Sequence, residues 1–152
     1  MGLDMYLIAK ARPVGDLYIN KEFEKYNPNY IAFDIGYWRK ANAIHGWFNR
    51  YLDGGVENCV DSCDLGLDDL LKLKKVCEEL LSIRTEEEFK KAAMEKLPPM
   101  EGSFFGPTNL DNEFSLESYI CDLKDTVRII DSCEEFNKKM DGHCWFVYHA
   151  WW

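Results

Sequence analysis

The stretch Gly36-Tyr37-Trp38-Arg39-Lys40-Ala41-Asn42-Ala43-Ile44-His45-Gly46-Trp47-Phe48 mixes aromatic, cationic, amide and imidazole side chains more densely than any other part of the chain. From Trp38 to Leu52 the apolar residues recur at three- and four-residue intervals, the spacing of one face of an α-helix. This apolar face consists of Ala41, Ile44, Phe48, Tyr51 and Leu52. We therefore predict a helix over Trp38–Leu52 that packs one face into the core. Gly36 allows a change of direction before the helix, and Asp53-Gly54-Gly55 ends it.

Strand patterns lie at both ends of the chain. Leu3–Ala11 alternates apolar and polar residues with the period of two that is typical of a strand. His143–Trp152 is dense in aromatic and β-branched residues, which predicts a terminal strand that pairs with the first one. Tyr30–Ile35 is predicted as either a short strand or an extended entry into the helix, and Val56–Asp64 as a short strand at a sheet edge. Asp16–Asn29 lacks a period and contains a turn signal, so we expect a surface excursion there.

Three further helices are predicted between these strands. Leu67–Leu81 has a strong helical apolar period. Thr85-Glu86-Glu87-Glu88 is a capping box that opens a helix to about Lys96, with the Thr85 hydroxyl capping the backbone at Glu88. A long helix is predicted over Leu116–Met140. The sequence therefore predicts an α+β fold, with a small and mainly antiparallel sheet, paired terminal strands and about four helices in a single domain covering residues 1–152.

Charge and composition narrow the classes of partner. The formal net charge is −9, which argues against direct nucleic-acid binding because phosphates are normally met by a basic surface. Residues 1–56 hold seven Lys/Arg and six Asp/Glu, whereas the remainder holds eleven and twenty-one. The predicted Trp38–Leu52 helix thus lies in the least acidic third, where an anion is not repelled. No cofactor motif is present, so we predict no cofactor. A second copy of the chain, giving a homo-oligomer, is considered as a further partner.

The six cysteines are interpreted as reduced thiols of a cytoplasmic protein, because the N-terminus does not resemble a secretory signal. No apolar run approaches the roughly twenty residues of a membrane span, so no membrane partner is expected. Zinc ligands drawn from Cys59, Cys63, His143 and Cys144 are disfavoured, since the only close cysteine pair is wider spaced than common zinc motifs. We therefore predict no metal site.

Four segments in this order resemble a family of small uncharacterised bacteriophage and prophage proteins. The specific ones are Met1-Gly2-Leu3-Asp4-Met5-Tyr6-Leu7 and the Gly36–Phe48 stretch. The loop Ser103-Phe104-Phe105-Gly106 and the segment Asp122-Leu123-Lys124-Asp125-Thr126 add less. The resemblance covers most of the chain. It implies a phage origin and a setting in the cytoplasm of an infected bacterium, but it supplies no catalytic residues.

The Gly36–Phe48 stretch also carries the candidate binding site. Tyr37 or Trp38 can stack on a planar group, Arg39 or Lys40 can bind an anion, and Asn42 and His45 can donate or accept hydrogen bonds. This mixture suits a small anionic, nucleotide-like ligand. The alternative is a helix at the edge of the core, with packed Trp and His and solvated cations. Gly46 favours a site, because glycine inside a helix often marks the close approach of a ligand or another backbone.

The loop Gly102-Ser103-Phe104-Phe105-Gly106-Pro107-Thr108 can close over such a site, with Phe104 or Phe105 offering a stacking face. The alternative is that both Phe side chains fill the core, as paired Phe residues commonly do.

The leading hypothesis is a phage accessory protein that binds a small anionic ligand, with Tyr37, Trp38, Arg39, Lys40, Asn42, His45, Phe104 and Phe105 as the ligand-binding residues, and thereby sequesters a host defence signal. The first alternative is an acidic inhibitor that binds a host protein through its charged helices. The second is a small hydrolase or transferase in which His45 acts as general acid or base, oriented by Asp4 or Asp34, with His143 and His149 as substitutes. A non-enzymatic protein is favoured.

Overall fold

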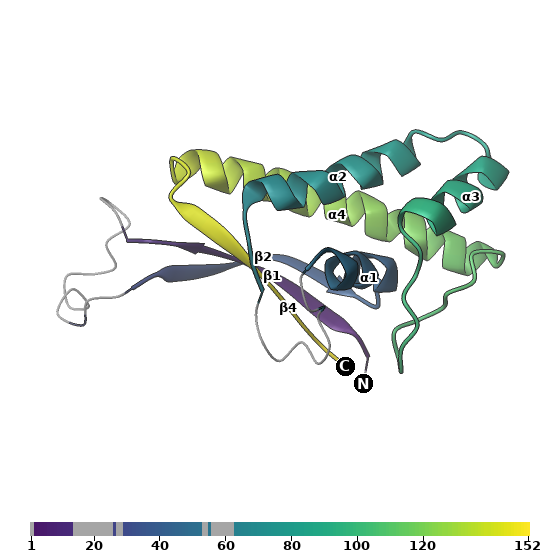
Figure 1. The fold of residues 1–152 in the computed structure, drawn as a ribbon, viewed down its shortest axis with the longest axis horizontal. Coiled ribbons are helices and arrows are strands. Elements are labelled where there is room, and N and C mark those ends of the chain that lie inside the picture. The colour runs from purple at the N-terminus through teal and green to yellow at the C-terminus, as the bar shows by residue number, and fades with distance from the viewer. Residues whose placement is uncertain (1, 14–25, 27–28, 53–54, 56–62) are drawn as a thin grey trace.

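The computed structural model describes residues 2–13, 26, 29–52, 55 and 63–152 of the chain. Four strands and four helices are arranged as the α+β fold that the sequence predicts (Figure 1). In chain order they are β1 (Asp4–Ala11), β2 (Ile31–Arg39), α1 (Asn42–Tyr51), β3 (Cys63–Leu65), α2 (Leu67–Leu81), α3 (Glu86–Lys96), α4 (Glu113–Lys139) and β4 (Cys144–Trp151).

The strands form one antiparallel sheet in the order β2-β1-β4-β3. The N-terminal strand β1 pairs with the C-terminal strand β4 over its whole length, from Asp4 opposite Trp151 to Ala11 opposite Cys144. This pairing confirms the predicted contact between the terminal strands. Both chain ends consequently lie together at one end of the sheet (Figure 1).

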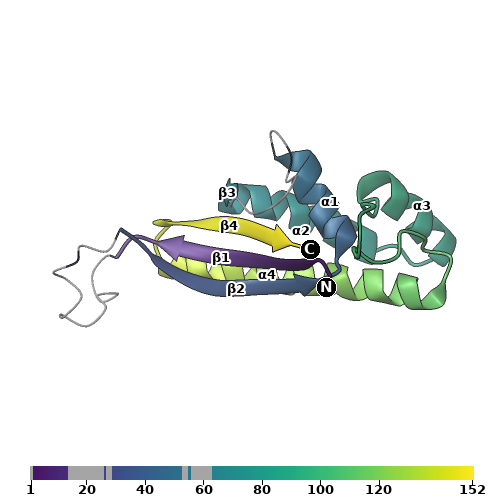
Figure 2. The same cartoon turned by 90° about the horizontal axis from the view of Figure 1, so that it is seen from below.

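The four described helices lie on the same side of the sheet, with α4 running along the strands and α2 beside it (Figures 1 and 2). The strand sequences explain this arrangement, because every second residue of β1 is buried while its neighbours are only partly covered. Met5, Leu7 and Ala9 are fully buried toward the helices. One hydrophobic cluster joins these strand residues to side chains from all four helices. None of the described helices lies over the opposite face of the sheet (Figure 2).

The predicted helix over Trp38–Leu52 is wrong at its beginning. β2 continues through Arg39, and α1 begins only at Asn42. The backbone alternates at this point, because Trp38 is 3% exposed on the helix side of the sheet and Arg39 is exposed on the other. Lys40 then turns the chain with a φ of 58°. Burial of the Trp38 indole thus keeps Trp38 and Arg39 in the strand, where we expected the first turn of the helix.

Gly36 lies inside β2 and does not redirect the chain. A β-carbon at this position would be 2.5 Å from Cγ2 of Ile129 on α4, so only glycine lets the helix approach the strand this closely. Next to it, Leu7 pairs with Gly36 and Ile8 pairs with Asp34, which leaves Ile35 as the extra residue of a β-bulge.

The helix ends lie close to the predicted positions, but the predicted cap at Thr85 is wrong. α4 begins at Glu113, three residues before the predicted start, where the Asn112 side chain accepts from the backbone of Phe114 and Ser115. Thr85 does not cap the backbone of Glu88 as expected. Its hydroxyl instead donates to the Glu88 carboxylate at 2.8 Å.

Other predictions fall on parts of the chain that are not described. Most of the excursion at Asp16–Asn29, the helix-ending Asp53-Gly54 and most of the Val56–Asp64 strand lie outside the described residues. Among the residues that are described, no helix combines the length and the apolar character needed to cross a bilayer.

Candidate functional site

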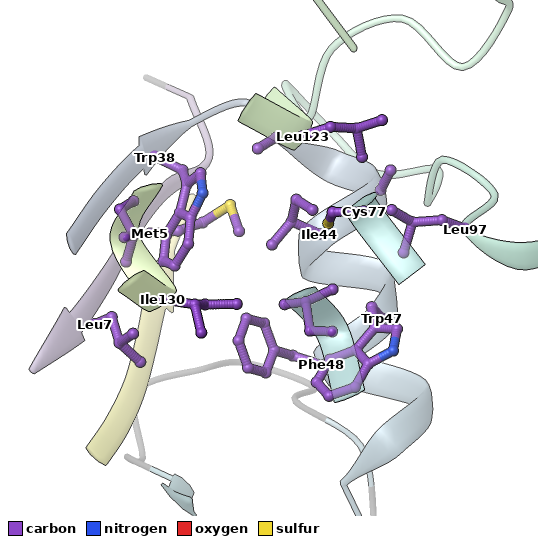
Figure 3. Close-up of a cluster of buried hydrophobic side chains, with 14 of the residues drawn as sticks. Met5, Leu7, Trp38, Ile44, Trp47, Phe48, Cys77, Leu97, Leu123 and Ile130 are labelled. Carbon is purple, nitrogen blue, oxygen red and sulfur yellow. The ribbon is translucent and has the colours of Figure 1, made fainter. Parts of the chain in front are cut away.

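Trp38 and Asn42, two predicted ligand contacts, are core residues. The Trp38 indole Nε1 donates to the Thr126 hydroxyl of α4 at 2.9 Å, and this hydroxyl in turn donates to the Asp122 carbonyl at 2.6 Å. The Asn42 amide is 5% exposed and donates to the Pro107 carbonyl at 3.0 Å. Figure 3 shows Trp38 among Met5, Ile130 and other apolar side chains. Neither side chain presents a face to a ligand.

His45 is likewise enclosed by protein. Its side chain is 0% exposed, and Nδ1 forms a 2.7 Å hydrogen bond with the Tyr148 hydroxyl. The rings of Phe105 and Trp152 lie edge-on to the imidazole, with centroids 5.2 and 5.4 Å away. Burial lowers the pKa of His45 from 6.5 to about 4, so the imidazole is neutral at neutral pH. Nε2 has no hydrogen-bond partner among the described residues.

This burial removes the basis for acid–base catalysis by His45 with Asp4. Asp4 accepts a hydrogen bond from the Tyr37 hydroxyl and faces Arg39, whereas His45 bonds to Tyr148. Asp34 is exposed on β2. His143 precedes β4, and His149 lies on the uncovered sheet face between Tyr6 and Trp151.

The two Phe side chains differ: Phe105 fills the core, and Phe104 is exposed. Phe105 is 3% exposed and packs its ring against His45 and Trp152, so it is a core residue and not a ligand contact. Phe104 is 62% exposed and has a φ of 65°. It therefore stays available as a stacking face.

Gly46 is explained by protein packing. A β-carbon there would lie 3.0 Å from Cβ of Met100 and 3.5 Å from the Pro98 carbonyl. The Met100 backbone N–H donates to the Asn42 carbonyl at 3.3 Å. Of the two causes considered for this glycine, the close approach of another backbone is therefore the one observed.

The remaining predicted contacts, Tyr37, Arg39, Lys40 and Phe104, are all exposed. The first three lie beside the start of β1, where Arg39 pairs with Asp4 and the Lys40 N–H donates to the Leu3 carbonyl. Gly2 is buried beside two of these residues. A β-carbon on it would be 3.2 Å from Cε of Lys40 and 4.0 Å from the Phe104 carbonyl. Beside it, an open hollow of about 210 Å³ is lined by Gly2, Asp4, Trp151 and Trp152. We call this group the terminal cluster; its members are Gly2, Asp4, Tyr37, Arg39, Lys40, Phe104, Trp151 and Trp152.

The cations of the terminal cluster are weakly held. Nε of Arg39 lies 3.9 Å from the Asp4 carboxylate, and the Arg39 side chain is 62% exposed. Such exposed ion pairs contribute at most about 1 kcal/mol, so an anion can draw Arg39 away. Lys40 forms no ion pair with any described residue. Tyr37 donates to Asp4 at 2.6 Å, and this hydrogen bond to a carboxylate raises the pKa of the phenol.

Aromatic rings continue from the terminal cluster across the uncovered sheet face. Tyr6 lies between Tyr37 and His149, with centroids 5.3 and 6.3 Å away. His149 in turn lies 5.6 Å from Trp151. This row crosses β2, β1 and β4, because these residues stand opposite one another in the strand registers.

Comparison of the chain with family models, curated proteins and solved structures found no match.

Two other hollows are lined by described residues, and the first of them shares Tyr37 with the terminal cluster. An open groove of about 430 Å³ follows the β2 edge and is lined by Tyr6, Asp34, Ile35, Gly36, Tyr37, Arg128 and Ile129. A groove of about 370 Å³ between α2, α3 and α4 is lined mainly by apolar residues, with Arg84 and Lys124 at its mouth. No group of three or more potential metal ligands occurs among the described residues. Cys59 lies outside them, as does the side chain of Cys63.

Sequence analysis did not identify Gly2, Trp151 and Trp152 as site residues. The signal available was their position at the ends of two strands predicted to pair. That pairing places residue 4 opposite residue 151, and hence brings the terminal aromatic pair to the start of the first strand.

Proposed function

We propose that the terminal cluster binds a small planar anionic ligand of the nucleotide type. The observation that carries the proposal is a hollow lined by Gly2, Asp4, Trp151 and Trp152, with two cations and a further exposed ring next to its lining residues. Arg39 is weakly paired with Asp4, and Lys40 and Phe104 adjoin Gly2. Aromatic faces hold planar groups, and guanidinium and ammonium groups bind phosphate or carboxylate.

Backbone conformation supports this location. Lys40 and Phe104 are two of three described non-glycine residues with positive φ, at 58° and 65°, and both adjoin Gly2. Such residues cost of order 1 kcal/mol or more each, and they concentrate at ligand sites. Both strained residues thus adjoin Gly2, which lines the hollow.

The rings at the hollow differ in how firmly they are held. Trp152 is 39% exposed and packs one edge on Phe105 and His45, whereas Trp151 is 60% exposed at the end of β4. Trp152 therefore supplies a fixed wall and Trp151 an adaptable one. A volume of about 210 Å³ suits one ring system. Its charged group would then lie toward Arg39 and Lys40, which adjoin the lining residues Asp4 and Gly2.

We further propose that the protein is a phage accessory protein and that capture of such a ligand removes a host defence signal. This part depends on the resemblance of the sequence to phage proteins and on the ligand chemistry. The acidic-inhibitor alternative stays a prediction, since no described feature favours it over binding at the terminal cluster.

Calorimetric titration tests the binding proposal. The panel consists of nucleoside mono- and triphosphates, cyclic mononucleotides and cyclic dinucleotides, each titrated into the full chain. We expect at least one dissociation constant below 1 mM, roughly −4 kcal/mol of binding free energy. Arg39→Ala should weaken that binding by about 1.5–3 kcal/mol, the scale of a charged hydrogen bond. Lys124→Ala, an exposed lysine of α4, serves as the matched control and should leave affinity unchanged.

Two outcomes count against the proposal: no panel member binds below 1 mM, or Arg39→Ala and Lys124→Ala have equal effects. A second variant separates binding from folding. Lys40→Gly relieves the positive φ and should raise stability by about 1 kcal/mol, while it removes a cation and weakens the ligand complex. A merely structural role for Lys40 predicts the gain in stability without the loss of affinity.

A further inference from the structure

The uncovered face of the sheet carries large side chains that no described helix covers (Figure 2). On β1 this face consists of Asp4, Tyr6, Ile8 and Lys10, all partly exposed. On β2 the residues opposite them are Arg39, Tyr37, Asp34 and Ala32. On β4 they are Trp151, His149, Val147 and Trp145, of which Val147 is already buried. Tyr37 and Trp151 are 50% and 60% exposed. Exposed Tyr, Trp and Arg on one surface are typical of protein interfaces.

The order of residues along β1 is self-complementary. Read from Asp4, the uncovered face presents an acid, an aromatic ring, an aliphatic chain and a base. If a second copy of this strand is laid over the first in the opposite direction, the base lies over the acid and the aliphatic chain lies over the ring. Asp4 and Lys10 are about 20 Å apart along the strand, so they form two separate pairs about a common centre.

We propose that a second copy of this chain covers this face, with the two β1 strands antiparallel about a two-fold axis that lies in the interface across the strands. This operation places Asp4 over the partner's Lys10 and Tyr6 over the partner's Ile8. The other two-fold operation that stacks the faces runs along β1 and places Asp4 near the partner's Asp4. Like charges in that position repel, so the charges select the antiparallel arrangement.

The neighbouring strands support the same arrangement. A two-fold axis across the strands places each strand over the same strand of the partner, with the two running in opposite directions. Tyr37 of β2, whose hydroxyl donates to Asp4 of its own chain, then lies over the partner's Asp34. Trp151 of β4 lies over the partner's Trp145, and the two rings bury apolar area at both ends of the interface. Both rings are at least partly exposed in the single chain.

Sheet twist does not disrupt these pairs. Stacked sheets cross at about 30°, which displaces side chains 10 Å from the centre by about 5 Å, within the reach of a lysine. A three-strand face is smaller than the roughly 800 Å² per partner of a standard interface. We therefore expect a dissociation constant on the order of 1–100 μM, in which burial of the rings sets affinity and the charges set orientation.

Charge exchange tests this inference in sedimentation velocity with the full chain. The wild type should show a dimer that dissociates between about 1 and 100 μM. Asp4→Lys and Lys10→Asp should each weaken it at least tenfold, because each creates two like-charge contacts. Mixed in equal amounts, the two variants should recover affinity to within about threefold, since every contact becomes attractive again. Lys124→Asp, the same charge change on α4, should have no effect.

Three results overturn the inference: a wild type that is monomeric at 1 mM, single variants that dimerise as tightly as the wild type, or a mixture that stays monomeric while both variants melt cooperatively. The double variant Asp4→Lys/Lys10→Asp keeps the test valid if either single variant is unstable, since it should dimerise with itself. This inference goes beyond the proposed ligand, although the stacked face shares Asp4, Tyr37, Arg39 and Trp151 with the terminal cluster. Separate variants distinguish the two failures, because Lys10 lies outside the terminal cluster and Lys40 lies outside the stacked strands.

Discussion

Protonation of His45 should unfold the protein selectively in acid. The imidazole is enclosed by aromatic rings, and burial lowers its pKa from 6.5 to about 4. The unfolded chain therefore binds a proton at pH values where the folded chain does not. The stabilising contribution of neutral His45 is present above pH 6.5 and is lost as the pH falls toward 4. Its full size is about 3 kcal/mol, of which about 2 kcal/mol is lost between pH 7 and pH 5.

The measurement requires a non-titrating reference, because Asp122 acts in the opposite direction. Burial, and secondarily the charge of Asp125, raises the pKa of Asp122 to about 7. Its folded carboxyl group therefore holds a proton that the unfolded one has lost, and its contribution to stability is lost as pH rises toward 7. The two groups offset each other in the wild type. Comparison of the wild type with His45→Gln removes the shared contribution of Asp122.

Urea denaturation at pH 7, 6 and 5 supplies the test. The wild type should exceed His45→Gln in unfolding free energy at pH 7, and this excess should shrink by about 2 kcal/mol at pH 5. His143→Gln, which replaces an exposed histidine before β4, should show no such change. An excess that is constant across this pH range, or a His45 resonance that titrates near 6.5, would refute the burial argument.

Three further predictions concern the core. Trp38→Phe should cost about 2 kcal/mol in urea denaturation, because it removes the indole bond to Thr126, whereas Trp151→Phe at an exposed position should change stability by less than about 0.5 kcal/mol. Gly36→Ala should cost about 1–3 kcal/mol of unfolding free energy, because the added methyl group contacts Ile129. The double variant Gly36→Ala/Ile129→Ala should lose less stability than the sum of the two single variants, and additive losses contradict the contact. Mass-spectrometric thiol labelling should modify Cys121 in the native state and spare Cys77 and Cys133, since burial raises the pKa of both buried thiols to about 12; rapid labelling of either contradicts their placement.

The fold was largely predictable because its signals are local. Alternation along Leu3–Ala11 and the helical period of Leu67–Leu81 each reflect one buried face, and the structure places both elements within a residue of the prediction. The boundary between β2 and α1 was not predictable in this way. Trp38, Asn42 and His45 have helical spacing, but the indole of Trp38 is drawn to Thr126, 88 residues later, and this contact holds the segment in the sheet.

The candidate site depended still more on distant contacts. Asn42 and His45 look like binding residues in sequence because their polar groups need partners, and those partners are Pro107 and Tyr148. The residues that stay exposed, such as Arg39 and Phe104, were identified from their chemistry. Their grouping with Trp151 was not, since it arises only when the first and last strands pair.

NMR mapping of a ligand from the nucleotide panel tests the central claim most directly. Titration should shift the amide resonances of Lys40 and Phe104 and the indole N–H of Trp151, and leave unchanged the indole N–H of Trp38, which is bonded to Thr126 in the core. Shifts centred on Trp38, Asn42 and His45, or an absence of shifts with every member of the panel, would contradict the assignment of ligand binding to the terminal cluster.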